Sequence, residues 1–202
     1  MRIEPARRRG PIQGLTFYDR QTGAHLSRLK EVALWLLITF LAIVLAVIVT
    51  LGFGRRLPVL GESMEPTLVN GQSVLVDRIS YRLRKVGRYD VIAFYPGGNT
   101  EAHAYIKRVV GMPGDSVEIR DGFLLINGVP DVHNADYDRI ADGGIASTPV
   151  TVAEDEYFVI GDNRNSSEDS RSASIGNVKK ETILGKVWYA LPGEGASMGG
   201  VR

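Results

Sequence analysis

The chain contains no cysteine. It therefore cannot form disulfide bonds, bind a metal through thiolates or use a cysteine nucleophile. Histidine is scarce too: His25, His103 and His133 are far apart, and no two of them have the spacing of metal ligands. A distant histidine can still meet a serine in space, so a Ser-His site is disfavoured rather than eliminated. The formal net charge of +1 lacks the basic bias of nucleic-acid-binding proteins, and no nucleic-acid partner is expected.

Charged residues are also absent from residues 32–54, which have the sequence VALWLLITFLAIVLAVIVTLGFG. A helix rises about 1.5 Å per residue, so this run would extend over roughly 34 Å, enough to cross a bilayer. A buried core helix and a cleaved signal peptide are the alternatives. A signal peptide has a shorter apolar stretch and a small-residue cleavage site, whereas this run ends in Gly-Phe-Gly before two arginines. The pattern predicts a permanent transmembrane anchor over residues 31–54.

Basic residues flank this anchor unequally. Seven lysine and arginine residues precede it, and only Arg55 and Arg56 follow it closely. Because cytoplasmic flanks carry the excess of basic residues, we expect a single pass through the cell membrane, with a cytoplasmic N-terminus and an extracytoplasmic C-terminal domain. Residues 1–30 are predicted to be a largely disordered basic tail. This tail either acts only as a topology signal, which is the favoured interpretation, or also contacts anionic lipid.

Beyond Arg56 the pattern changes to short runs of apolar, β-branched and aromatic residues, often in alternation, which is typical of strands. The predicted strands are 73–77, 90–95, 104–110, 116–119, 123–126, 157–160 and 183–190. Asp121-Gly122 and Asn127-Gly128 accept the positive φ angles of tight turns, so each predicts a turn, the first within a hairpin. Amphipathic helical segments are hard to find. Residues 55–192 are therefore predicted to form a mostly β, largely antiparallel domain outside the membrane.

Two further segments carry few strand signals. Residues 130–155 are polar and are expected to form a loop or a small excursion from the sheet, which would make a small cap. Residues 193–202 are rich in glycine and are expected to be a flexible tail.

Ser63 lies nine residues beyond the apolar run, in the segment Gly-Glu-Ser-Met-Glu-Pro-Thr-Leu that covers residues 61–68. A serine close to a membrane surface is well placed to attack a chain that emerges from the bilayer. Its hydroxyl is hardly ionised at neutral pH, so it needs a base to become a nucleophile.

Lys107 is a candidate for this base. Alternation along its predicted strand places Tyr105, Lys107 and Val109 on one face, without an adjacent charge on that face. Burial among such neighbours would lower the pKa of the lysine and make its neutral form accessible. From the strand alone, however, a lysine that lays its stem on the sheet and keeps its head in water is the more common arrangement.

A densely polar segment, GDNRNSSEDSR at residues 161–171, follows the predicted strand at 157–160. A loop in this position can present hydroxyls and carboxylates to a site at the end of the sheet. A solvated turn is the alternative. A calcium loop fits poorly, because the segment lacks glycine at the sixth position and glutamate at the twelfth.

Four blocks, in this order, resemble those of the bacterial type I signal peptidases (leader peptidases), which are membrane-anchored serine proteases with a Ser-Lys dyad. These blocks are 63–68, 87–94, 105–115 and 161–171. The resemblance covers about residues 30–190. It implies that Ser63 is the nucleophile and Lys107 the general base. Lysine in this role favours the bacterial branch over the eukaryotic-type relatives, which use histidine.

The resemblance also implies supporting residues in the polar loop. Ser167 would orient the Lys107 amine by a hydrogen bond, and Asp169 and Arg171 would form a pair that braces the site. Asp162 is a further acidic residue of the same loop. Asn165 departs from the family pattern, because an aspartate is common at its position.

Other residues of the implied site lie on the nucleophile and lysine segments. Tyr105 is expected to support the site, and Met64 to line the substrate cleft. The Ser63 N–H would be one donor to the oxyanion. Many family members carry a serine hydroxyl as second donor where this chain has Gly61, so the second donor is predicted to be a backbone group or water.

The resemblance implies a serine endopeptidase that removes signal peptides from secretory preproteins after small residues, of the Ala-x-Ala type, without a metal or cofactor. Membrane lipid and a secretion translocon are further expected partners. A dedicated processing peptidase with a single substrate remains an alternative, and so does a membrane protein that binds signal sequences without cutting them. The intact pair of Ser63 and Lys107 disfavours a protein that only binds signal sequences. A repressor-type autoprotease lacks support, because no helix-turn-helix precedes the β domain.

Overall fold

A computed structural model describes residues 17–79, 86–133, 137–193, 195–196 and 198–201. The chain divides into two compact units, Met1–Val47 and Ile48–Arg202. Among the described residues, helices with complete bounds are α1 (Phe17–Phe53) and the 3₁₀ segments η1 (Pro96–Gly98), η3 (Gly144–Ser147) and η4 (Lys180–Thr182). The larger strands are β1 (Arg55–Pro58), β2 (Ser73–Asp77), β3 (Val91–Phe94), β4 (Tyr105–Gly111), β5 (Ser116–Arg120), β6 (Phe123–Ile126), β9 (Glu156–Ile160) and β11 (Ile183–Ala190). Two-residue strands are β7 (Val129–Pro130), β8 (Val150–Thr151), β10 (Val178–Lys179) and β12 (Gly199–Gly200).

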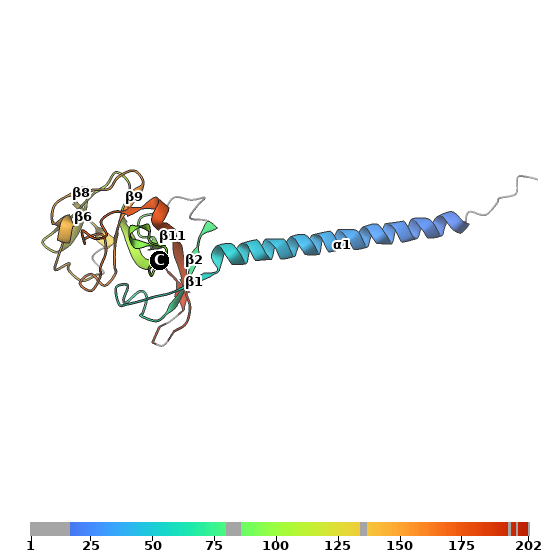
Figure 1. Cartoon of the computed structure of the whole chain (residues 1–202), viewed down its shortest axis with the longest axis horizontal. Helices are drawn as coiled ribbons and strands as arrows, with labels where there is room; N and C mark the ends of the chain where they lie inside the picture. The colour runs from blue at the N-terminus through green and yellow to red at the C-terminus, as the bar shows by residue number, and fades with distance from the viewer. Residues whose placement is uncertain (1–16, 80–85, 134–136, 194, 197, 202) are drawn as a thin grey trace, which may run out of the picture. The chain divides into compact units, whose positions relative to one another are not determined.

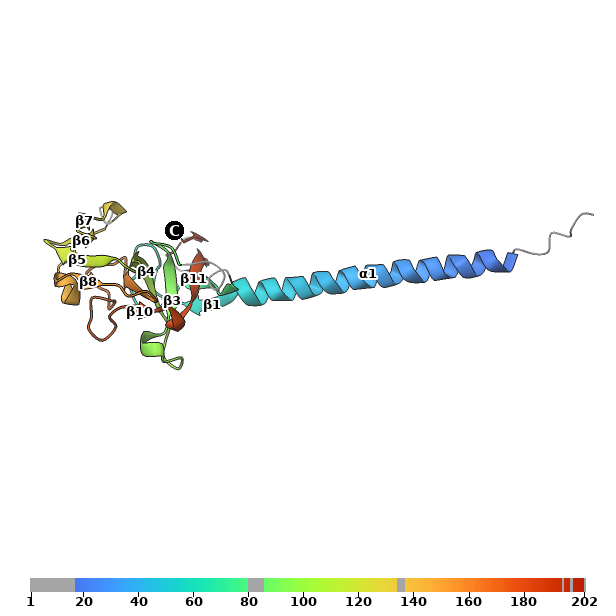
Figure 2. The ribbon, with the colours of Figure 1, turned by 90° about the horizontal axis from the view of Figure 1, so that it is seen from above.

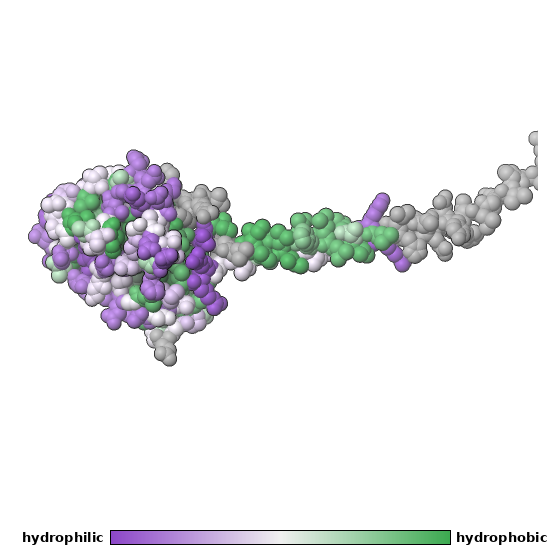
Figure 3. All heavy atoms as spheres, in the orientation of Figure 1, coloured by the Kyte–Doolittle hydropathy of each residue, from purple (hydrophilic) through white to green (hydrophobic). Residues whose placement is uncertain are grey.

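Helix α1 contains the predicted anchor. Its segment Arg28–Thr50 is the one helix in the described part of the chain that is long and apolar enough to cross a membrane. Figure 3 shows the described side chains of α1 as a nearly continuous hydrophobic surface. Within this segment the Thr39 hydroxyl donates to the Trp35 carbonyl oxygen at 2.8 Å. A helix that is apolar all round satisfies its polar groups internally, as an anchor must.

The helix begins earlier than the sequence pattern indicated. Residues 17–30, predicted as part of a disordered tail, are helical, because α1 starts at Phe17. Once a helix is nucleated, each added residue gains one backbone hydrogen bond, and residues 17–30 contain no proline to stop this. The remainder of the predicted tail, residues 1–16, lies outside the described residues.

The second unit is mostly β, as predicted. Its main sheet has the strand order β1-β2-β11-β3-β4-β9-β10, with β12 paired to β11, and a second sheet has the order β7-β6-β5-β8. Every strand pair in these two sheets is antiparallel. Figures 1 and 2 both show β6 and β8 grouped at one side of this unit.

The main sheet is buried on both faces at its centre. All four residues of β3 are buried. Val91 and Ala93 pack in one hydrophobic cluster and Ile92 and Phe94 in another, as the alternation of side chains along a strand requires. A third cluster contains residues of β5 and β6 together with residues of β9, so it packs the second sheet against the main sheet.

The two predicted turns are confirmed. Asp121 and Gly122 have φ angles of 53° and 79° and join β5 to β6 in a hairpin. Asn127 and Gly128, at 54° and 80°, join β6 to β7. A small cap is present as the second sheet, and residues 130–155 contribute to it through β8 and η3. Three apolar residues of that polar segment are buried in its core, namely Ile140, Ala146 and Val152.

The flexible tail predicted at residues 193–202 is wrong in part. Gly199 and Gly200 form β12, which pairs with Ala190 and Tyr189 of β11. Gly193 also forms a bridge with Ala196. Backbone hydrogen bonds need no side chain, so a glycine-rich segment can still add to the edge of a sheet.

Candidate active site

Ser63 sits in the loop between β1 and β2. The loop is closed by backbone hydrogen bonds from Val59 N to Gln72 O at 2.8 Å and from Gly71 N to Val59 O at 2.9 Å. Met64 and Leu68, at 1% and 0% exposure, anchor it in the hydrophobic cluster beneath. Ser63, next to one of these anchors, is half-buried.

Lys107 approaches the serine from the centre of the main sheet. It lies on β4, which pairs with β3 on one side and β9 on the other, and only 4% of Lys107 is exposed. The Lys107 Nζ and the Ser63 Oγ form a hydrogen bond of 2.6 Å. The Tyr105 ring lies on the same side, with its centroid 5.4 Å from the Lys107 Nζ. The two candidate residues, 44 positions apart, are therefore in direct contact.

Burial changes the acidity of this lysine. It lowers the pKa of Lys107 from 10.5 to about 8, and burial is the largest cause. The carboxylates of Asp169, Glu168 and Asp162 oppose this shift, because each favours the charged amine. A neutral amine that can accept the Ser63 proton is thus available near and above pH 8.

The polar loop at 161–171 enters the site through the register of the sheet. Ile160 at the end of β9 pairs with Arg108, so the chain leaves β9 next to Lys107. Within the loop, Arg171 donates from Nε to Asp169 Oδ1 and from Nη2 to Asp169 Oδ2, both at 2.8 Å. The Gly161 N–H also donates to Asp169, at 3.0 Å. The expected contact between Asp169 and Arg171 is therefore present, and both residues are buried.

Ser167 lies beside Asp169 and Arg171, but its hydroxyl bonds to a different partner from the expected Lys107 amine. Its hydroxyl donates to Asp169 Oδ2 at 2.7 Å. Among the described residues, no hydrogen bond joins it to Lys107. The carboxylate is a stronger acceptor for a hydroxyl than a neutral amine, which accounts for this preference. Ser167 also packs against the backbone of Gly161, where an added Cβ would collide with its hydroxyl and with the Ser63 carbonyl oxygen.

Asp162 links the two halves of the site. Arg108 donates to its carboxylate from Nε at 2.7 Å and from Nη2 at 2.6 Å, and the Thr67 hydroxyl donates to it at 2.6 Å. Thr67 lies four residues after Ser63, and Arg108 follows Lys107. Asp162 therefore joins the nucleophile loop to the strand of the base. We call this group of Thr67, Asp162 and Arg108 the clamp.

Sequence reasoning did not identify Arg108, Thr67, Gly161 or Asn163 as site residues. Asn163 donates from its backbone to the Ser63 carbonyl at 3.1 Å and from its side chain to the Glu62 carbonyl at 3.2 Å. One signal was available: the neighbours of Arg108 on its own face of the strand, Ile106 and Val110, are apolar, and a charge on such a face needs a partner. Asn165 bonds to the cap, accepting from Ala141 N at 2.9 Å.

The backbone N–H of Ser63 is a candidate donor to an oxyanion. Within the described residues the Ser63 N–H has no acceptor, so it is available to an oxyanion. The Gly61 N–H donates to the Asn70 side chain at 3.0 Å. Gly61 itself has a φ angle of +84°, a conformation that favours glycine.

A cleft of ≈ 230 Å³ opens beside the pair. Residues 59–64 and 103–107 line two of its walls, and Ser166 and Glu168 line the third. Met64 and Tyr105, both expected at the site, are among these residues. No group of three or more metal-ligating side chains occurs in the part of the chain that the structure describes.

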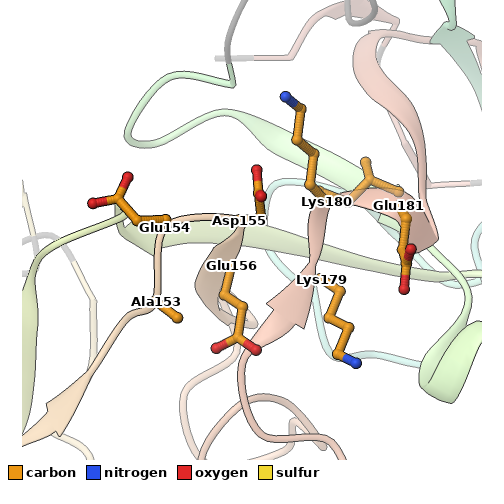
Figure 4. A pocket seen from close by; sticks show the side chains of 8 residues that line it. Ala153, Glu154, Asp155, Glu156, Lys179, Lys180 and Glu181 are labelled. Atoms are coloured by element: carbon orange, nitrogen blue, oxygen red, sulfur yellow. The ribbon is translucent and has the colours of Figure 1, made fainter.

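A larger pocket of ≈ 760 Å³ lies elsewhere, between Ala153–Glu156 and Lys179–Glu181. It borders the start of β9, whereas the polar loop follows the end of that strand. Figure 4 shows that its labelled charged side chains diverge and do not converge on one point. The smaller cleft is therefore the one that combines a nucleophile with a base.

Comparison with known proteins identifies the family of this chain. The family model described as "Signal peptidase, peptidase S26" matches residues 32–191. "Signal peptidase I P" of Bacillus subtilis subsp. natto is 32% identical over 162 residues, which are 75% of this chain and 84% of that protein. "Signal peptidase IB" of Staphylococcus aureus (strain COL) is 31% identical over 175 residues, 79% of this chain and 89% of that protein.

A solved structure is similar as well. The crystal structure of a signal peptidase I from Enterococcus faecalis V583 is 32% identical, covers 52% of this chain and 97% of its own, and has a TM-score of 0.40. The family match spans well over half of the residues, from the anchor to the last long strand. The chain belongs to the signal peptidase family, peptidase S26.

Proposed function

We propose that this chain is a membrane-anchored serine endopeptidase that removes N-terminal signal peptides from exported preproteins. The observation that carries this proposal is the 2.6 Å contact between Ser63 Oγ and the Nζ of Lys107, whose pKa burial lowers to about 8. A buried lysine with a lowered pKa is what a serine needs as a base. The anchor α1 belongs to the same chain, which keeps the enzyme where exported chains emerge.

In the proposed mechanism, neutral Lys107 accepts the proton of Ser63 as its Oγ attacks the scissile carbonyl carbon. The Ser63 N–H and one further donor stabilise the oxyanion of the tetrahedral intermediate. Lys107 then gives the proton to the leaving amine, and an acyl-enzyme on Ser63 remains. Water activated by the neutral lysine hydrolyses this ester and releases the signal peptide.

Supporting residues keep this geometry. The clamp joins the segment of Ser63 to the strand of Lys107, and Asp169 holds Gly161 and Ser167 beside them. Ser167 therefore supports the site through its hydrogen bond to Asp169. Met64 lines the cleft and is buried.

Three finer points belong to the same proposal. The excess of basic residues before α1 favours a cytoplasmic N-terminus and an extracytoplasmic catalytic domain. The small volume of the cleft favours small residues before the cut, of the Ala-x-Ala type. Preproteins are the expected macromolecular partners, delivered by a secretion translocon through the lipid bilayer that holds α1.

The test compares Ser63→Ala and Lys107→Ala with the wild type, as full chains in detergent or vesicles, on a preprotein with an Ala-x-Ala site. Either change should lower the cleavage rate by at least about a thousandfold, as expected when a nucleophile or its base is removed. Lys179→Ala is the matched control, because Lys179 is exposed on β10. Cleavage by both variants at the wild-type rate would overturn the dyad.

The same assay separates the alternatives. A panel of several unrelated preproteins distinguishes a general enzyme from a peptidase with one substrate. A protein that only binds signal sequences would leave every preprotein intact, in the wild type as in Ser63→Ala.

A further inference from the structure

Glu168 places a carboxylate in the wall of the cleft that contains Ser63 and Lys107. Its Oε2 accepts a hydrogen bond from the Tyr105 hydroxyl at 3.2 Å, and its Oε1 accepts one from the Ser174 hydroxyl at 3.3 Å. Tyr105 belongs to β4, whereas Ser174 follows the polar loop. The carboxylate is therefore held between β4, which lines the cleft, and the segment that follows the polar loop.

This carboxylate has no ion-pair partner among the described residues. Glu168 is exposed, and no lysine or arginine of the described residues forms an ion pair with it. The two hydroxyl contacts are long and neutralise nothing. Lys107 shares the cleft, and in its reactive form it is neutral. A negative charge thus remains in the wall of the cleft when the enzyme is ready to react.

A purely structural tie between β4 and the loop would not need this charge. A neutral amide could contact the same two hydroxyls, because its oxygen would accept from one and its NH2 would donate to the oxygen of the other. Glu62, which also lines the cleft, adds a second carboxylate with no ion-pair partner among the described residues. The cleft therefore presents negative charge to whatever chain it binds.

We propose that Glu168 is a specificity-determining residue that favours substrates with a lysine or arginine side chain within a few residues of the scissile bond. The inference rests on the proposed function and adds to it the chemistry of one substrate position. Because Glu168 is exposed, the preference is modest: about two- to fivefold in kcat/KM, the effect of one solvated charge pair. It shrinks as salt screens the interaction.

The experiment uses fluorogenic peptides cleaved by the full-length enzyme. The small residues before the cut are kept, and each neighbouring position in turn carries Lys, Gln or Glu. In the wild type, one position should show a higher kcat/KM for Lys than for Glu. Glu168→Gln keeps the acceptor for Tyr105 and should lose this preference, whereas Glu168→Lys should invert it. Glu154→Gln, an exposed glutamate beside the remote pocket, is the matched control and should keep it.

The outcomes are separable. An equal ratio of Lys to Glu substrates in the wild type and in Glu168→Gln, at every position and at low salt, would overturn the inference. Failure of the wild type to cleave any peptide or preprotein would contradict the proposed function instead. The Gln substrates report whether a variant has lost activity in general, so a folding defect in Glu168→Lys cannot imitate a change of preference.

Discussion

Two buried pairs of arginine and aspartate involve the polar loop at 161–171, and they have different structural roles. Arg171 and Asp169 are two residues apart, so this pair shapes the loop itself. Arg108 and Asp162 are 54 residues apart, and Thr67 reaches Asp162 from 95 residues away. The local pair, with its partners Ser167 and Gly161, is here called the brace. The clamp holds separate elements in place, whereas the brace sets the shape and charge of one wall.

Asp162→Asn should break the clamp and have the largest effect. The side chain of Arg108 is only 5% exposed, so the change leaves a buried guanidinium without its counter-charge. Removing one partner of a buried pair costs about 3–5 kcal/mol. Denaturant unfolding of the wild type and the variant measures this loss. Glu118→Gln, whose partner Arg120 is 60% exposed, is the control and should cost under about 1 kcal/mol. Equal losses at both sites would mean that Asp162 is no clamp.

Gly161→Ala tests the point where clamp and brace meet. The added Cβ would collide with the Ser63 carbonyl oxygen and the Ser167 hydroxyl, so the proposed nucleophile must shift. A displacement of about 1 Å at a reacting group costs roughly a hundredfold in rate. Steady-state kinetics should show the loss in kcat. Gly199→Ala has open space around the new methyl group and should behave as the wild type. A Gly161→Ala variant with unchanged kcat would show that the nucleophile tolerates the shift.

Thr67→Val removes one arm of the clamp and keeps the shape of the side chain. The lost hydrogen bond has a charged acceptor, and because Thr67 is half-buried we expect the low end of the range for such bonds, about 1.5 kcal/mol. Thr67→Ser retains the hydroxyl and should restore both stability and activity. If valine and serine behave alike, the hydroxyl contributes nothing to the clamp.

The family resemblance predicted the Asp169–Arg171 contact of the brace, whereas the contacts of the clamp were not predicted. Asp169 and Arg171 are neighbours in one motif, so their contact needs no knowledge of the fold. The clamp depends on the register that places Ile160 beside Arg108, and no local pattern encodes this register. Ser63 and Lys107 were paired through their chemistry and the family resemblance, and the structure brings them into contact.

The lack of a local sequence pattern also explains which strands were not predicted. Strands of four or more residues with alternating or continuous apolar residues, such as β4 and β11, were predicted close to their observed bounds. A strand of two residues, such as β8, β10 or β12, cannot show a period at all. These short strands exist because a longer neighbour offers free backbone groups. Tertiary context, which is absent from the local sequence, creates them.

The pH dependence of kcat/KM distinguishes the clamp from the brace, because their charges affect the pKa of Lys107 to different extents. Below its pKa of about 8, Lys107 is protonated and cannot accept the Ser63 proton, so kcat/KM should fall about tenfold for each further pH unit.

Among the charges that affect the pKa of Lys107, Asp169 raises it more strongly than Asp162 does, and Arg171 lowers it. Asp169→Asn removes a carboxylate that favours the ammonium and leaves the Arg171 charge that disfavours it. Loss of the Asp169 carboxylate lowers the pKa of Lys107, so the acidic limb of the profile should move to lower pH. Asp162→Asn should move it less, although it costs more stability than a surface substitution. A larger shift in Asp162→Asn than in Asp169→Asn would contradict the division between a clamp that positions the base and a brace that tunes it.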